Sequence, residues 1–213
     1  MSIVTLPATL RIGAGGGMGQ TRFDLFTQSD STGAQQLRLM APPRWTLRLV
    51  QPDNMGQSDA GFWQALVLQL RGRVNILAAW DTSKPSPQGI MRGSMALSAI
   101  AAAGATSLAI AAGAGQAATT LMAGDWLQIG SGLGTGQLVM VTAAALADSA
   151  GTITVNIEPP LRQAYASVTA VTWDKPIAYY RQQTDSTTWS MANGGRSGAL
   201  VSGMSLDLME VWS

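Results

Sequence analysis

The 213-residue chain is 46% hydrophobic and only 12% charged, with a formal net charge of +1 and no cysteine or histidine. The near-zero net charge excludes a strongly basic surface for nucleic acid or anionic membranes. The absence of cysteine excludes disulfides and thiolate metal sites, and the absence of histidine excludes the commonest general base. Average soluble domains carry about 25% charged residues. We therefore expect neighbouring subunits to cover part of this surface, because large exposed apolar patches usually mark interfaces.

The first part of the chain has the alternation of β-strands. Leu37 and Leu39, then Trp45, Leu47 and Leu49, are separated by polar residues, and this period of two predicts half-buried strands. Upstream lies the glycine-rich run 13–19. It lacks the Gly-Lys-Ser/Thr ending of a phosphate loop, so we interpret it as a flexible loop.

One helix is predicted downstream of these strands. Ser58 can cap its start and Gly72 can end it. The helix carries four apolar residues at i, i+3, i+4 and i+7: Trp63, Leu66, Val67 and Leu70. This spacing predicts one buried face packed against a sheet.

A change of composition near residue 92 predicts a domain boundary. The apolar run 74–80 predicts a buried strand, and the proline-containing stretch 81–89 predicts a stiff, exposed connector. The Ala-rich run 95–118 is interrupted by Gly104, Gly113 and Gly115. It is too polar for a membrane span, and we expect a soluble chain without one.

Residues 93–172 are nearly free of charge and predict an inserted module. Turns separate five short candidate strands at roughly the 8–12-residue spacing of a barrel or sandwich: 107–110, 126–129, 138–142, 152–157 and 168–173. We interpret the glycine-rich stretch 130–136 as a hairpin loop.

The chain then returns to the first domain. A strand at 177–181, a glycine-rich turn at 193–195 and a last strand at 200–212 are predicted. The fold class is therefore mainly β: residues 1–92 and 173–213 form a sandwich or split barrel with one packed helix, and residues 93–172 form a small inserted β-barrel or sandwich.

The acidic residues show no catalytic or metal-binding pattern. The twelve Asp and Glu residues are scattered and include no EF-hand ladder. We expect no catalytic residue, no metal and no cofactor. Asp125 caps the turn before Trp126 in our interpretation. A paired-carboxylate site assembled from distant residues such as Asp125, Asp148 and Glu158 stays open, and a cell-wall hydrolase is the least favoured class.

The seven tryptophans are expected to serve two purposes. Trp45, Trp63 and Trp80 lie on apolar faces and should be core residues. For Trp126, Trp173 and Trp189, either core packing or an exposed sugar-stacking role stays open.

Arg162 follows a pair of prolines, Pro159 and Pro160, which fix an extended path. Two interpretations of this arginine stay open: a solvated loop residue, or a clamp between domains or subunits that uses its planar guanidinium.

A series of short motifs follows in a specific order along residues 60–180: Trp63, Leu66, Leu70, Gly72 and Asn75; Pro85, Pro87, Gly89 and Gly93; Gly104, Ala105, Thr106, Ser107 and Leu108; Gly124 and Asp125; Gly151, Thr154, Val155 and Ile157; Pro159, Pro160, Leu161 and Arg162; Pro176. This order resembles distal tail proteins of long-tailed bacteriophages. The residues before Trp45 depart from the family's pattern.

The resemblance implies a structural virion protein with no enzyme activity. It would form a ring, usually a homohexamer, at the distal end of the tail tube, after assembly in the host cytoplasm and without required nucleic-acid contact. Its partners would be the tail tube protein, the hub or fibre proteins and the nearby tape-measure protein. Residues 1–92 and 173–213 would form the ring domain and residues 93–172 a peripheral β-domain.

The interface or structural candidates are Trp63, Leu66, Val67, Leu70, Trp126, Pro159, Pro160 and Arg162. The alternative function is a carbohydrate-binding module that attaches to host glycans through exposed tryptophans such as Trp126.

Overall fold

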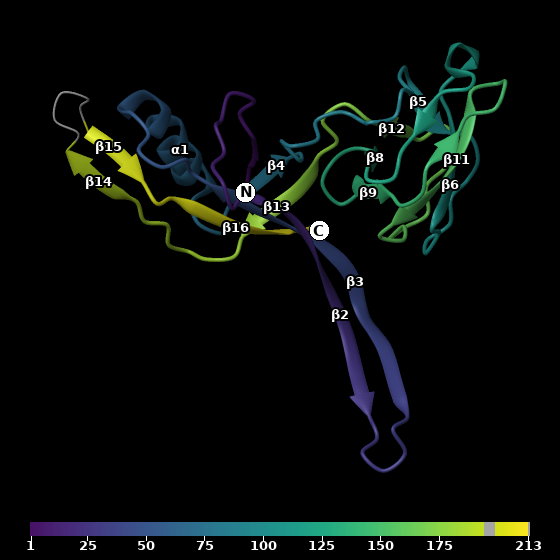
Figure 1. Cartoon of the computed structure of the whole chain (residues 1–213), viewed down its shortest axis with the longest axis horizontal. Helices are drawn as coiled ribbons and strands as arrows, with labels where there is room; N and C mark the ends of the chain where they lie inside the picture. The colour runs from purple at the N-terminus through teal and green to yellow at the C-terminus, as the bar shows by residue number, and fades with distance from the viewer. Residues whose placement is uncertain (194–198, 213) are drawn as a thin grey trace.

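The computed structural model describes residues 1–193 and 199–212 and shows a mainly β chain with one α-helix. Figure 1 shows an open sheet with its helix, a barrel beside it, and a long hairpin that projects away from both. All strands of the barrel lie between Met95 and Thr172, whereas the strands of the open sheet come from both sides of that range.

The open sheet has six strands in the order β1-β4-β13-β16-β3-β2. Its strands are β1 Ile3–Thr5, β2 Gly17–Gln28, β3 Gln35–Val50, β4 Ile76–Ala79, β13 Ala178–Gln182 and β16 Ser205–Glu210. β1 runs parallel to β4, and the other neighbouring pairs are antiparallel. The chain thus enters at one edge of the sheet and forms the opposite edge next.

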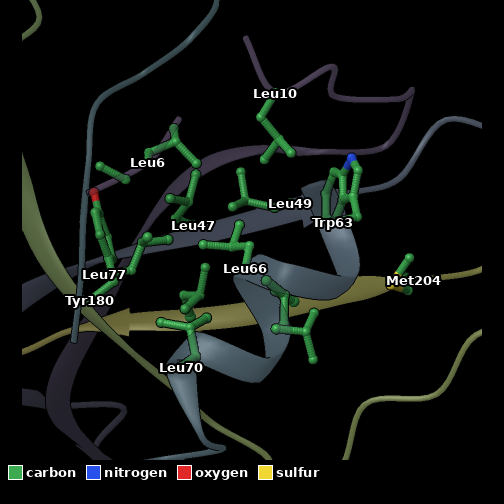
Figure 2. Close-up of a cluster of buried hydrophobic side chains, with 14 of the residues drawn as sticks. Leu6, Leu10, Leu47, Leu49, Trp63, Leu66, Leu70, Leu77, Tyr180 and Met204 are labelled. Atoms are coloured by element: carbon green, nitrogen blue, oxygen red, sulfur yellow. The ribbon is translucent and has the colours of Figure 1, made fainter. Parts of the chain in front are cut away.

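Helix α1, Gln57–Leu70, packs its apolar face on this sheet, as the spacing predicts. Trp63, Leu66 and Leu70 are each at most 1% exposed, and Val67 is 9% exposed. Figure 2 shows the side chains of Trp63, Leu66 and Leu70 among those of the sheet, including Leu47, Leu49 and Leu77. The Trp63 indole N–H donates to the Arg11 carbonyl at 2.9 Å, so the helix also holds the segment before β2.

The ends of α1 differ from the prediction. The N-cap is Gly56, which has no side-chain cap bond, so the prediction that Ser58 caps the helix is wrong. Ser58 instead lies inside the helix, in its first turn. At the other end, Arg71 turns left-handed with φ 50°, and Gly72 follows with φ 63°. The helix therefore ends one residue earlier than predicted, because a non-glycine residue, Arg71, already takes the left-handed position.

The β2–β3 hairpin extends well beyond the sheet (Figure 1). β16 pairs with β3 over Thr46–Val50, and we call the part of the hairpin beyond this pairing, residues 22–44, the arm. Leu37 and Leu39 lie in it and are 70% and 57% exposed. The prediction of half-buried residues is therefore wrong for these two, because no described element covers the arm. It is right for Trp45, Leu47 and Leu49, which lie over the core.

The predictions for the two glycine-rich segments, residues 13–19 and 130–136, have different outcomes. Residues 17–19 begin strand β2, so the flexible loop predicted for 13–19 is wrong in its last part. Residues 130–136 are the hairpin loop that was predicted, because Ile129 of β8 pairs with Gln137 of β9 across it.

The inserted segment is a closed six-stranded barrel in the order β11-β6-β5-β12-β8-β9. Its strands are β5 Met95–Leu97, β6 Ser107–Ala111, β8 Trp126–Ile129, β9 Gln137–Val141, β11 Thr152–Glu158 and β12 Ala170–Thr172. β7 Thr120–Leu121 and β10 Ala145–Leu146 form a small ribbon beside it, and η1 Ala114–Gln116 is a short 3-10 turn. A separate apolar cluster that includes Leu108, Ile110 and Val139 fills the barrel.

The predicted strand 200–212 is two strands. β15 Ala199–Ser202 pairs with β14 Ser190–Asn193, and β16 begins at Ser205. Gly203, with φ +85°, separates them in a backbone conformation that favours glycine. The predicted turn at 193–195 lies, from residue 194 on, outside the described residues.

Candidate functional site

Two tryptophans join the sheet to the barrel. Trp45 of β3 and Trp126 of β8 meet edge to face, with ring centroids 4.7 Å apart and planes at 78°. The Trp45 indole N–H donates to the Leu138 carbonyl of the barrel at 2.9 Å, and that of Trp126 donates to the Asp81 carboxylate at 3.0 Å. Trp126 is 4% exposed, so its ring is not free to stack on a sugar.

Arg162 forms an ion pair with Glu210 across the same junction. Arg162 lies in the segment between β11 and β12 of the barrel, and Glu210 ends β16 of the open sheet. Their side chains are 12% and 3% exposed. The Trp45 backbone N–H donates to the other Glu210 oxygen at 3.0 Å. Of the two interpretations of Arg162, the solvated loop residue is wrong, and the geometry is that of a clamp between the two parts of this chain.

The charges of this clamp are largely removed from water. Burial raises the pKa of the Glu210 carboxyl above its ordinary value, against the opposing attraction of Arg162 and the hydrogen bond from Trp45. The Arg162 guanidinium also lies 3.6 Å from the centroid of the Trp212 ring, a cation–π distance. The ring of Trp212 therefore shields the ion pair.

The side-chain amide of Gln137 positions the segment that carries Arg162. Its Nε2 donates to the Pro160 carbonyl at 2.9 Å, and its Oε1 accepts the Arg162 backbone N–H at 2.8 Å. Gln137 is 1% exposed and Pro159 is also buried. The predicted proline path is therefore held by a side chain that the sequence did not single out.

The connector 81–89 is tied to the barrel rather than freely exposed. The Asp125 carboxylate accepts the backbone N–H groups of Gln88, Gly89 and Met122 at 2.6, 3.1 and 2.7 Å. A Cβ added to Gly89 would lie 2.2 Å from the Thr120 carbonyl oxygen. The prediction of an exposed connector is wrong for this end, and Asp125 caps backbone groups as predicted.

The two chain crossings into and out of the barrel lie together. The Trp173 indole N–H donates to the Gly93 carbonyl at 2.8 Å, and the Arg92 guanidinium lies 5.0 Å from the Trp173 ring centroid. Trp173 and Trp189 are half-buried, whereas Trp80 is buried. Residue 92, where the boundary was predicted, is thus next to this crossing.

The arm carries a group of exposed apolar side chains. Five large side chains on it are at least half exposed: Leu25 50%, Phe26 55%, Leu37 70%, Leu39 57% and Met40 60%. The register pairs Phe26 with Leu37 and Asp24 with Leu39, which places Phe26, Leu37 and Leu39 on one face. At its base, Arg22 pairs with Glu158 of the barrel at 3.0 Å.

Within residues 1–193 and 199–212, no group of three or more His, Cys, Asp or Glu side chains is placed to hold a metal ion. Over the same described residues, no helix is long and apolar enough to cross a membrane. The chain matches no protein-family model, and no curated protein matches it.

Proposed function

We propose that this chain is a structural virion protein that forms a symmetric ring at the distal end of a phage tail tube. The ring would connect the tail tube protein to hub or fibre proteins, with the end of the tape-measure protein nearby. The order of motifs over residues 60–180 supports the family, and the low content of charged residues supports assembly.

The bare apolar arm is the observation that carries this proposal. A two-stranded ribbon without a covering layer is marginally stable in water, and an exposed strand edge with apolar side chains invites pairing with another chain. Here both conditions meet in residues 22–44, where Leu37 and Leu39 face solvent on a projecting hairpin. A partner in an assembly would supply the missing layer.

The junction supports an adaptor role for the barrel. Trp45, Trp126, Arg162 and Glu210 fix the barrel against the sheet through buried contacts. A barrel fixed in this way would hold any partner bound to its outer surface at a defined position relative to the ring. In the proposed assembly, the sheet domain forms the ring and the barrel lies at its periphery.

Immunogold labelling tests this proposal in the natural particle. Particles released from cells that encode the chain would be labelled with an antibody raised against it and imaged by negative-stain microscopy. The proposal expects gold at the distal end of the tail and none on heads or tail shafts. Label on another part of the particle, or on no particle although the purified protein reacts with the antibody, would overturn it.

A further inference from the structure

The two edges of the open sheet are both available for pairing. In the described chain, β1 forms one edge and pairs with β4 alone, whereas β2 forms the other edge. The Ser2 carbonyl accepts a hydrogen bond from the Ile76 N–H, and the Leu6 N–H donates to the Ala78 carbonyl, so the backbone groups of Ser2 and Leu6 face β4. Because backbone groups alternate along a strand, those of Ile3 and Thr5 point to the open side.

The β1 edge has a hollow beside it that is lined by both apolar and polar side chains. The hollow measures about 750 Å³ and is lined by residues 1–5, by the end of α1 and by the segment that follows it. Four of its side chains are largely exposed: Met1 75%, Ile3 49%, Leu68 66% and Val74 55%. An unpaired strand thus lies next to a recess of mixed lining that exposes four apolar side chains, an arrangement that can accept an added strand.

The arm has the complementary properties. It is extended, its outer β2 edge is unpaired among the described residues, and it presents Phe26, Leu37 and Leu39 on one face. One strand edge offers backbone hydrogen bonds and the apolar side chains fill a recess, which is how strand addition combines affinity with register. The arm therefore suits the β1 edge as an occupant.

We infer that the arm of one copy docks on the β1 edge and the adjacent hollow in the next copy, which extends the sheet from copy to copy. The occupant is a second copy because every chain carries both halves of this contact on opposite edges of one sheet. Such a head-to-tail contact closes into a ring when the rotation between neighbouring copies divides a full turn into a whole number of steps without a rise along the axis.

A stable, specific interface buries at least about 1,200 Å² in total, so this contact is stable only if both the arm and the receiving edge are covered. This inference rests on the proposed ring and specifies the two surfaces that form it.

Cross-linking of single-cysteine variants tests the contact, because the chain has no cysteine of its own. Phe26→Cys places a thiol on the arm and Ile3→Cys places one on the receiving edge. A short bismaleimide would be added to each variant alone and to an equal mixture, followed by denaturing electrophoresis. The inference expects a cross-linked dimer in the mixture, and at least tenfold less in either variant alone.

Ile100→Cys is the matched control, because this barrel residue is 77% exposed and lies outside both surfaces. Mixed with Phe26→Cys, it should give no more than the background dimer. A dimer from Phe26→Cys alone would show an arm-to-arm contact and overturn the inference. An equal yield from the control mixture would overturn it as well.

A second set of variants separates the contact from the function. Leu37→Asp and Leu39→Asp should raise the concentration needed for assembly at least tenfold with an unchanged near-UV circular dichroism spectrum, whereas Ile100→Asp should not. Rings without the mixed cross-link overturn the inference and leave the proposed function. The mixed cross-link without label at tail tips supports the contact and contradicts the function. A chain that stays monomeric overturns both.

Discussion

Trp45 and Trp126 lie edge to face, 4.7 Å between ring centroids, although they are 81 positions apart and belong to the open sheet and the barrel. Trp126 and Leu138 of the barrel are part of the apolar cluster that fills the sheet domain. The barrel is therefore held by a buried contact as well as by its two connectors. Domains joined by connectors alone are expected to move relative to one another.

Removal of the Trp126 ring should destabilise the junction. Trp126→Ala should lower the free energy of unfolding by about 3–5 kcal/mol, the usual cost of removing a buried aromatic side chain. Trp126→Phe should cost less, because it keeps an aromatic ring against Trp45. Urea unfolding followed by circular dichroism measures both changes. A loss under about 0.5 kcal/mol for Trp126→Ala would show that the ring is exposed in solution.

Removal of one partner of the clamp should cost more than replacement of both. Arg162→Met leaves the buried Glu210 carboxylate without its charged partner and should destabilise by about 3 kcal/mol. The double variant Arg162→Met with Glu210→Gln should recover most of that loss, since an amide oxygen can still accept the Trp45 N–H. Equal losses in the single and double variants would contradict the buried ion pair.

Glu210 should also give the protein a specific pH dependence. Its pKa in the folded chain is raised, chiefly by burial, above the ordinary 4.5. The folded state then binds the proton more tightly than the unfolded state, so the contribution of Glu210 is fully present below about pH 4.5. That contribution is lost as the pH rises from there through the raised folded pKa.

The difference in unfolding free energy between the wild type and Glu210→Gln isolates this effect. The wild type should lose stability relative to the variant as the pH rises through this window, and the difference should level off above it. Urea titrations at a series of pH values measure the two curves. A wild type that gains on the variant as the pH rises would show that the folded pKa is depressed.

The packing of α1 is tested by two leucines on the same helix. Leu66 is 1% exposed and Leu68 is 66% exposed. Leu66→Ala should destabilise by about 2–5 kcal/mol, whereas Leu68→Ala should stay within about 0.5 kcal/mol. Similar losses at both positions would contradict the orientation of the helix.

The local spacing of apolar residues correctly predicted the helix and several of the short barrel strands. The spacing of Trp63, Leu66, Val67 and Leu70 predicted the helix face, and the short apolar runs predicted β8 and β11 closely. These patterns work because one face of each element meets a core. The same pattern failed at Leu37 and Leu39, where strand pairing continues but the core has ended.

The contacts between the sheet and the barrel could not be predicted, because they join residues that are far apart in the sequence. Arg162 and Glu210 are 48 positions apart and Gln137 lies 25 positions before Arg162. One signal for Glu210 was present in the sequence: it follows Leu206 and Leu208 on the inward face of β16. A charged residue at such a position needs a buried partner, but the sequence alone did not identify which arginine supplies it.

The size of the purified protein tests the proposed assembly most directly. Light scattering after size exclusion at tens of micromolar, the range in which even micromolar contacts form, would be combined with negative-stain microscopy of the same fractions. We predict closed rings of identical copies, six in the arrangement that the family resemblance implies, and their loss in Leu37→Asp. A wild-type protein that remains a monomer at that concentration, with no rings in the micrographs, would contradict the proposed assembly.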